Sequence, residues 1–303
     1  DFVFYDENPD AMIAASIYLI GREKPPQNNC ISRELKSPDF QKLKSAGKNN
    51  IVIFNTLRSY YSDFDGVDEV ILINPHESGL QNISVSQILY QAVGKPTTLM
   101  RDLTGIAVVM DYTLEEAIEI IVEIVKSYPD LFEEVAKHIK NITLNKYNIH
   151  DSVFGELTAL FRAPSILNGA KGVETVIYQL LMNPEFSLAD LLKGEGNKAI
   201  EFLQKCSAEY KKILAKEIDL FENKKEVQGI TLIYMPQYQS ENFIREFSNV
   251  IKDRNVDSII MMKVPTKNNM YKYSIRRGEL EIDLGGILEE MDVGGGNPFA
   301  AGC

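Results

Sequence analysis

The first residues of the sequence that could do chemistry lie between positions 6 and 10. The stretch Phe2–Tyr5 is apolar, and Asp6, Asn8 and Asp10 follow it before a run of small residues begins. Open α/β sheets place their ligand sites at the carboxyl ends of strands, just before a helix. The same polar side chains could instead cap the helix that starts near Asp10. The sequence therefore predicts a candidate site at this turn, with helix capping as the alternative.

A second candidate lies between residues 263 and 277, near the C-terminus. This stretch has no acidic residue, contains Tyr271 and Tyr273, and has five basic residues: Lys263, Lys267, Lys272, Arg276 and Arg277. Basic side chains neutralise phosphates and tyrosine rings stack on bases, so the stretch is a candidate contact for single-stranded nucleic acid. A solvated hairpin on an acidic protein is the alternative. Gly294–Gly296 follow as a loop whose backbone N–H groups suit a phosphate.

The composition limits the partners of the protein. The 303 residues carry a formal net charge of −11, so nucleic-acid binding would need a local basic patch or a partner. The three cysteines, Cys30, Cys206 and Cys303, are far apart and predict no disulfide framework, which is typical of a cytoplasmic protein. The apolar runs are too short to span a membrane, and no secretory leader is recognisable.

The elements that would position the first candidate site alternate between strand and helix. Residues 50–56 and 68–75 are β-branched and apolar, as strands buried on both faces are. Residues 10–21 indicate a helix that ends at Gly21. This alternation predicts an α/β domain with a parallel sheet and helices on both faces.

From Thr113 the sequence becomes helical. Thr113 and Glu116 have the spacing of a capping box, and further helices are predicted through Leu192. The region from Thr113 to Leu192 is a candidate contact surface for a partner protein, since it includes apolar residues such as Phe154, Leu157, Leu160 and Phe161. The alternative is that these residues belong to a core helix within the chain.

The spacing of apolar residues over 196–225 predicts one long amphipathic helix that would connect two domains. After it, strands are predicted at 229–236 and 257–265, with a helix capped at Ser240 between them and alternating strands over 270–283. The predicted organisation is a domain of residues 1–193, a connecting helix over 194–225 and a C-terminal domain over 226–303. The first domain would have an α/β core over 1–112 and a helical part over 113–193.

The order of these stretches resembles the DHH phosphoesterase superfamily, and within it the RecJ-like exonucleases and their replisome relatives. That family has His-x-Asp-x-Asp-Gly after the first strand, Asp after the second, Asp-His-His after the third, a fourth-motif Asp and a final Gly-Gly-Gly-His-x-x-Ala-Ala-Gly. The corresponding stretches here are DENPDA, VIFNT, VILINPHESG, LTGIAVVMD and GGGNPFAAG. The resemblance implies a DHH-type parallel-sheet domain, a connecting helix and a smaller DHH-associated α/β domain.

The resemblance also implies which site positions have changed. Active members hold two divalent metals, usually manganese, with Asp and His side chains. Asp10, His76 and Asp111 match the motifs, whereas the other positions carry different residues: Asp6, Asn8, Asn55, Asn74, Pro75 and Asn297. The neutral amides of the asparagines and the side chain of Pro75 are poor ligands for two divalent cations. Because hydrolysis by this family depends on those cations, no catalytic residue is expected. Asp111 could also be only a strand-to-helix turn, and His76 only a loop residue.

Three carboxylates remain at the motif positions. The resemblance implies at most one weakly bound manganese or magnesium ion at Asp10, Asp111 and Asp6, with no cofactor required. In the C-terminal domain it implies phosphate contacts from Ser274 and Arg276, together with further candidate residues for nucleic acid or phosphate: Lys272, Arg277, Gly294, Gly295, Gly296 and Asn297.

The function that the resemblance implies is that of a pseudo-nuclease, a binding or scaffolding subunit in DNA replication, DNA repair or RNA turnover. Its partner would be an active RecJ-like paralogue or a GINS-type replisome component, with weak binding of single-stranded DNA or RNA. The rival hypothesis is an enzyme, namely a weak metal-dependent single-strand exonuclease or small-nucleotide phosphodiesterase. Manganese binding discriminates the two, because hydrolysis by this fold needs the ion.

Overall fold

The computed structural model describes residues 2–22, 27–31, 37–47, 50–54, 69–75, 79–80, 83–111, 113–140, 149–183, 185–194, 197–265 and 270–303. For residues 27–31, 37–40, 140, 150 and 297 it describes the backbone alone. The chain divides into two compact units, Asp1–Ser207 and Ala208–Cys303. The division falls within α10 (Lys198–Lys224), so this long helix contributes residues to both units.

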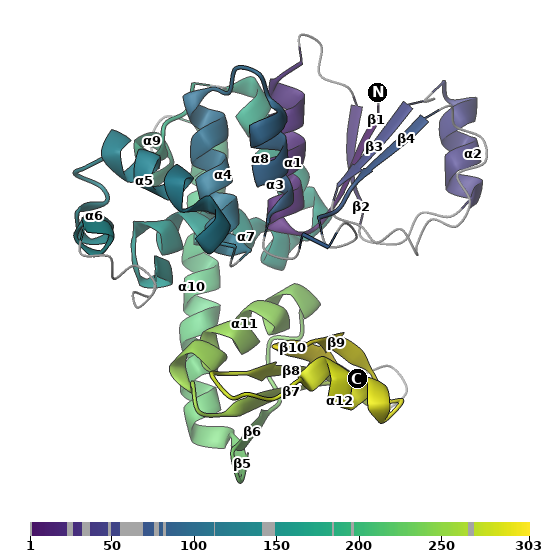
Figure 1. Ribbon diagram of the computed structural model, residues 1–303, viewed down its shortest axis with the longest axis vertical. Helices are drawn as coiled ribbons and strands as arrows, with labels where there is room; N and C mark the ends of the chain where they lie inside the picture. The colour runs from purple at the N-terminus through teal and green to yellow at the C-terminus, as the bar shows by residue number, and fades with distance from the viewer. Residues whose placement is uncertain are drawn as a thin grey trace. The chain divides into compact units, whose positions relative to one another are not determined.

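The first unit contains a parallel sheet with the strand order β2-β1-β3-β4 (Figure 1). Successive side chains of β1 enter different cores, since strand residues alternate between faces. Val3 and Tyr5 pack with the main helical cluster, whereas Phe4 packs with Leu43 of α2 (Ser37–Ser45). The strands are β1 (Phe2–Asp6), β2 (Gln27–Ile31), β3 (Asn50–Phe54) and β4 (Glu69–Ile73). The predicted α/β class is confirmed.

Helix α1 (Pro9–Ile20) follows β1 and is buried on almost every side. Its small residues Ala11, Ala14 and Ala15 allow α3 (Val85–Ala92) and other helices to pack closely around it. The helix ends at Gly21, as the sequence predicts.

Among the remaining helices of the first unit, α5 differs from the prediction at its N-terminus. The predicted capping box at Thr113 is not formed, because a 3₁₀ turn precedes α5 and α5 has no side-chain cap. A capping box forms instead between Ser187 and Asp190. The helices are α4 (Thr98–Met110), α5 (Ile118–Ser127), α6 (Glu133–Lys140), α7 (Val153–Asn168), α8 (Ala170–Met182) and α9 (Leu188–Lys193), with 3₁₀ turns at Glu115–Ala117 and Ile149–Asp151.

The prediction that the apolar residues of α7 are exposed for a partner is wrong. Phe154, Leu157, Leu160 and Phe161 are at most 2% exposed and belong to the main core. Phe154 packs against Phe132, with 4.5 Å between the ring centroids. Helical spacing of apolar residues marked an inward face here, because α4 and α8 pack against α7.

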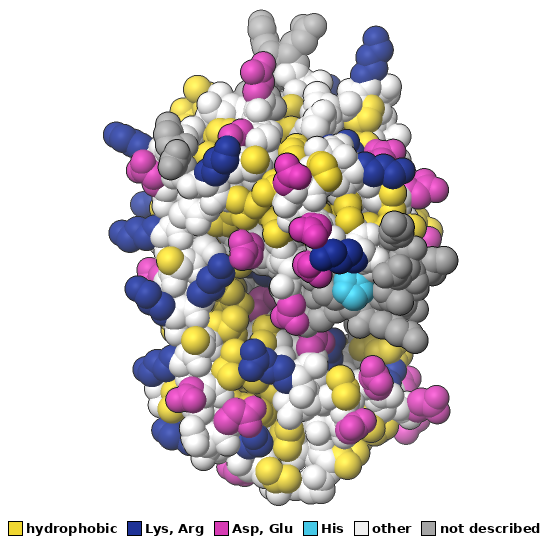
Figure 2. Space-filling model, turned by 90° about the vertical axis from the view of Figure 1, so that its left-hand side faces the viewer, with side chains coloured by type: hydrophobic (Ala, Val, Ile, Leu, Met, Phe, Trp, Pro, Cys, Tyr) yellow, Lys and Arg dark blue, Asp and Glu magenta, His cyan; other side chains and the backbone are white. Residues whose placement is uncertain are grey.

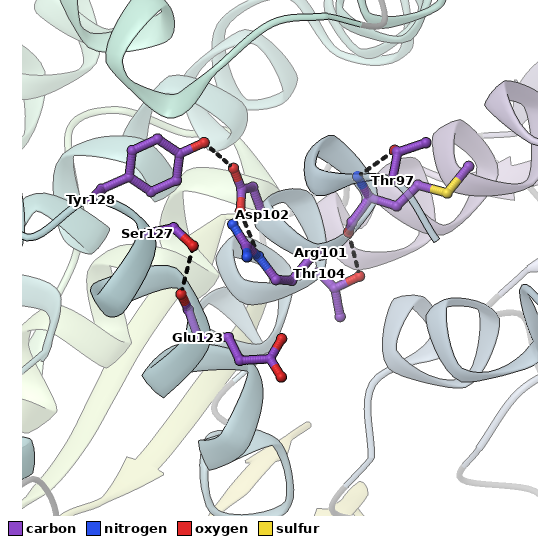
Figure 3. Close-up of polar contacts among 8 residues, drawn as sticks. Thr97, Arg101, Asp102, Thr104, Glu123, Ser127 and Tyr128 are labelled. Carbon is purple, nitrogen blue, oxygen red and sulfur yellow. Dashed lines mark hydrogen bonds and ion pairs between the residues drawn. The ribbon is translucent and has the colours of Figure 1, made fainter. Parts of the chain in front are cut away.

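A buried polar cluster joins α4 to the end of α5 (Figure 3). Asp102 accepts hydrogen bonds from the Arg101 guanidinium at 2.7 Å and 3.0 Å and from the Tyr128 hydroxyl at 2.6 Å. Burial raises the pKa of the Asp102 carboxyl, and the bonds from Tyr128 and Arg101 oppose that rise. Burial and the bond to Asp102 raise the pKa of Tyr128 to about 12. This cluster lies outside every sequence motif and stabilises helix packing.

The second unit contains a mixed sheet with the order β5-β6-β7-β8-β10-β9. β6 and β7 are parallel and the other neighbours are antiparallel. The predicted strands at 229–236 and 257–265 and the helix capped at Ser240 are confirmed. The elements are β5 (Glu226–Gln228), β6 (Thr231–Tyr234), α11 (Glu241–Arg254), β7 (Ile259–Pro265), β8 (Tyr271–Arg277), α12 (Leu284–Glu290), β9 (Gly295–Asn297) and β10 (Ala300–Gly302).

Two helices pack against different sides of the β7–β8 pair. Ile259 and Met261 of β7 join the cluster that contains α12, whereas α11 contacts β7 and β8 with its own buried side chains, such as Phe247. The prediction of alternating strands over 270–283 is only partly right, because β8 ends at Arg277 and no strand follows before α12. No helix in the described part of the chain is long and apolar enough to cross a membrane.

Candidate functional site

The turn between β1 and α1 is organised by hydrogen bonds from the chain itself. An Asp6 carboxylate oxygen accepts a hydrogen bond from the Asn8 backbone N–H at 2.6 Å. Asn8 is the N-cap of α1, and its side-chain oxygen accepts from the Asp10 backbone N–H at 2.9 Å. Pro9 occupies the first helical turn, where its missing N–H costs nothing. The capping alternative therefore holds for Asn8, whereas Asp6 binds the backbone of the N-cap residue and does not itself cap α1.

Asp10 is buried and binds the N-terminus of α3. One carboxylate oxygen accepts from the Val85 backbone N–H at 2.7 Å, and the other accepts from the Ser86 backbone N–H at 3.1 Å and hydroxyl at 2.5 Å. The positive end of the helix dipole favours a carboxylate at this position. Burial raises the pKa of Asp10, and the hydrogen bonds from Ser86 and Val85 oppose the rise.

The two described residues directly after β4 provide little for a metal ion. Asn74 is buried and neutral, and Pro75 has no side-chain ligand. The Pro75 carbonyl accepts from the Leu80 backbone N–H at 3.0 Å. Asn55 and His76, which complete the predicted motif positions of this unit, lie outside the described residues.

Asp111 ends a helix rather than a strand. It is the C-cap of α4, and its backbone N–H donates to the Ala107 carbonyl at 2.9 Å. Arg162 of α7, which is buried, donates to the carbonyl of Met110, the residue before Asp111. One turn further along α7, the Ser165 hydroxyl donates to the Glu7 carbonyl at 3.1 Å. Helix α7 thus contacts both segments that carry the retained carboxylates.

The described members of the donor set do not assemble a two-metal centre. No three His, Cys, Asp or Glu side chains within the described ranges gather where they could hold a metal ion, and Asp6, Asp10 and Asp111 are among those searched. Asn8 uses its oxygen as a helix cap and Asp10 uses both of its oxygens at α3. The single weak ion that the sequence analysis allows at these carboxylates is not confirmed.

In the second unit, Ser274 and Arg276 line an open pocket of about 270 Å³ between β8, β10 and the start of α11. The Arg276 guanidinium donates to the Asn249 side chain at 3.0 Å and to the Ile275 carbonyl at 2.8 Å, which orients it toward α11. Lys272 lies 3.8 Å from Glu241, and both side chains are largely exposed. The pocket therefore mixes basic groups with one carboxylate.

Arg277 lies apart from that pocket. Strand alternation turns it away from Arg276, and its guanidinium donates to the Pro298 carbonyl at 2.8 Å and stacks over Phe299 at 4.3 Å. The predicted basic stretch is therefore divided between two faces of β8. Lys263 pairs with Glu226 at 3.4 Å, and Lys267 lies outside the described residues.

The glycine motif forms the edge hairpin of the second sheet. A Cβ on Gly294 would lie 2.1 Å from the Gly302 carbonyl oxygen, and one on Gly296 would lie 2.3 Å from that of Ala300. Glycine is needed at both positions for this close backbone approach. Asn297 pairs with Ala300 through the backbone, and its side chain is outside the described part. A phosphate role for Gly294–Gly296 stays a prediction.

Sequence reasoning missed Ser86 and Arg162, which contact the carboxylate segments. Ser84 and Ser86 flank Val85 just before an apolar helix, and this N-cap signal could have marked the start of α3. Arg162 gives no comparable signal, because a basic residue in an amphipathic helix is normally exposed.

Solved structures of other proteins share this fold. The pGpG-specific phosphodiesterase PggH from Vibrio cholerae matches with a TM-score of 0.54 and 12% identity over 100% of this chain and 92% of its own. RecJ from Thermus thermophilus in complex with Mn²⁺ matches with a TM-score of 0.60 and 12% identity over 99% of this chain. This chain covers 49% of that RecJ, so it spans about half its length.

A structure of exonuclease RecJ bound to manganese matches with a TM-score of 0.55 and 11% identity over 99% of this chain and 84% of its own. No protein-family model matches the sequence, and no curated protein matches it. The RecJ-like fold that the sequence motifs imply is confirmed by these structures.

Proposed function

We propose that this chain is a catalytically degenerate, RecJ-like protein that acts as a binding or scaffolding subunit. The observation that carries the proposal is the engagement of Asp10 by Val85 and Ser86. An ionised carboxylate offers about four acceptor positions, and three are used here by the N-terminus of α3. The retained motif carboxylate is therefore explained by the fold, without a metal ion.

Positive charge from the chain itself supports the same proposal. The N-terminus of α3 supplies it at Asp10, and the Arg162 guanidinium supplies it at the end of α4, beside Asp111. In a two-metal phosphoesterase this electrostatic role belongs to the dications. Arg162 also complements the negative end of the α4 dipole, which stabilises the turn that positions Asp111.

The second candidate function is that of a weak metal-dependent exonuclease or small-nucleotide phosphodiesterase. The observation in its favour is the open pocket lined by Ser274 and Arg276, which is large enough for a phosphate group. The fold is also that of a pGpG-specific phosphodiesterase over almost the whole of both chains. Such an enzyme would need ligands that the described carboxylates do not assemble.

A protein is the principal partner in this proposal, either an active RecJ-like paralogue or a GINS-type component in DNA replication, DNA repair or RNA turnover. Acidic and basic side chains are interspersed on the face shown in Figure 2, without a broad basic field. A chain of net charge −11 also repels nucleic acid at long range. Single-stranded DNA or RNA would bind weakly at Ser274 and Arg276.

Hydrolysis assays test the proposal. Labelled single-stranded DNA, single-stranded RNA and pGpG are incubated with the protein and Mn²⁺ or Mg²⁺, with exonuclease RecJ as the positive control. We expect no product above the protein-free background. Metal-dependent turnover that disappears in Asp111→Asn would instead establish the enzyme hypothesis.

Co-expression with the RecJ-like and GINS-type candidates, followed by size-exclusion chromatography with light scattering, tests the scaffold role separately. A stable complex of defined mass supports it. A chain that always elutes alone contradicts it.

A further inference from the structure

Helix α12 carries apolar side chains on more of its surface than the sheet covers. Leu284 and Leu288 are buried with Ile275 of β8. Ile287 and Met291 continue the same apolar stripe at helical spacing but are 44% and 62% exposed. Part of this amphipathic helix therefore faces solvent with apolar groups.

Two further exposed apolar residues lie at the ends of α12. Val293 is 50% exposed, and its backbone N–H donates to the Leu288 carbonyl at 3.2 Å, which holds it at the C-terminal end. Phe299 is 61% exposed and follows Pro298, whose carbonyl accepts from the Leu284 backbone N–H at 3.2 Å. Exposed apolar side chains gathered along one element mark an interaction site more often than isolated ones do. We call this set the α12 face: Ile287, Met291, Val293 and Phe299.

The α12 face lies beside the edge of the second sheet. α12 packs alongside β9 (Figure 1). The Glu289 carboxylate is close to Gly295 of β9, since a Cβ atom added to Gly295 would lie 3.4 Å from its oxygen. β9 is the last strand in the sheet order and pairs with β10 on one side, with no second partner strand within the described residues. A helix next to an open strand edge is the geometry in which a peptide adds as a further strand.

Acidic side chains predominate around α12, and one basic group, the Arg277 guanidinium, stacks over Phe299 of the α12 face. Residues 279–292 contain no Lys or Arg and six acidic residues, all exposed: Glu279, Glu281, Asp283, Glu289, Glu290 and Asp292. A second copy of a chain with net charge −11 would bring like charge to this rim. Charge complementarity therefore favours a basic occupant.

We propose that the α12 face and the β9 edge bind an extended segment of another protein that carries apolar and basic residues. Backbone hydrogen bonds to β9 position the segment, its apolar side chains pack on Ile287 and Met291, and its basic side chains pair with acidic residues such as Glu289 and Glu290. The surface lies wholly within the second unit, so it is independent of whether the chain hydrolyses phosphodiesters.

Fluorescence anisotropy with a labelled peptide of alternating Val and Lys tests this proposal, with a Val and Glu peptide as the charge control. We expect saturable, salt-sensitive binding of the first peptide alone. The double variant Ile287→Ser and Met291→Ser should weaken binding about tenfold, since removing apolar contacts at the centre of an interface costs about 1.4 kcal/mol or more. Glu289→Lys with Glu290→Lys should weaken it as well.

Met182→Ser is the matched control, because Met182 is 61% exposed on α8 of the first unit. Its affinity for the peptide should equal that of the unmodified protein. Absence of saturable binding, or equal binding by every variant, overturns the proposal. A dimer that dissociates in the Ile287→Ser and Met291→Ser variant would assign the face to a second copy instead. A lower melting temperature of that variant without peptide would assign it to packing within the chain.

Discussion

Asp10 and Asp102 are both buried carboxylates of the first unit, but only Asp10 lies at a motif position. Asp102 accepts from the Arg101 guanidinium and the Tyr128 hydroxyl, and it holds α4 against the end of α5 (Figure 3). Asp10 accepts from Val85 and Ser86 and holds α1 against α3. The motif carboxylate is thus as fully engaged in packing as one that lies in no motif. An aspartate at a motif position is therefore, by itself, weak evidence for a metal ligand.

The largest expected effect is that of Asp10→Ala. It removes the acceptor for three buried donors, so we expect the free energy of unfolding to fall by about 3–5 kcal/mol. Urea unfolding followed by circular dichroism measures this. The control is Asp6→Ala, which should cost only about 1 kcal/mol because the described Asp6 bond is local and half-buried. Equal losses of unfolding free energy in the two variants would show that Asp10 contributes no more to stability than Asp6.

Arg162→Met sharpens the comparison at the end of α4. It removes a charged donor from the Met110 carbonyl while keeping most of the side-chain volume, and we expect a loss of about 1.5–3 kcal/mol in the free energy of unfolding. Arg162→Lys keeps the charge and should recover part of this stability. If both variants unfold like the unmodified protein, Arg162 contributes no compensating charge.

Asp102→Asn should change the pH dependence of stability by a smaller amount. The folded-state pKa of Asp102 is raised above its ordinary value of 3.8. The contribution of Asp102 to the free energy of unfolding is therefore fully present below pH 3.8 and is lost as the pH rises through the folded-state pKa. The unmodified protein should therefore lose stability relative to the variant between acidic and neutral pH. Parallel stability curves for the two proteins, from urea unfolding at each pH, would contradict this assignment.

The smallest effects are expected on nucleic-acid binding by the second unit. Arg276→Glu should weaken binding of a labelled oligothymidylate about tenfold at low salt, because it reverses a charge in the pocket. Arg277→Glu should change the affinity less than about twofold, since that side chain contacts Pro298 and Phe299 instead. Equal effects of the two substitutions would show that Arg276 and Arg277 belong to one basic surface.

The sequence predicted most of the fold because buried strands and capped helices leave local patterns. Strands β3 (Asn50–Phe54) and β7 (Ile259–Pro265), the end of α1 at Gly21 and the cap at Ser240 all follow from such patterns. The α12 helix was missed because Gly285 and Gly286 interrupt its helical propensity.

The candidate site was less predictable, since its contacts join distant parts of the chain. Asp10 binds residues 75 and 76 positions away, and Arg162 binds a carbonyl 52 positions away. No local spacing encodes such pairs. The inward face of α7 was misread for a related reason, because periodicity shows that Leu157 lies on an apolar face but not whether that face is covered.

Isothermal titration calorimetry with Mn²⁺ tests the central claim most directly, with the manganese-binding RecJ from Thermus thermophilus as the positive control. We predict no saturable heat for this protein at neutral pH, because Asn8 and Asp10 are committed to α1 and α3. Binding of two manganese ions per chain, lost in Asp111→Asn, would contradict the account.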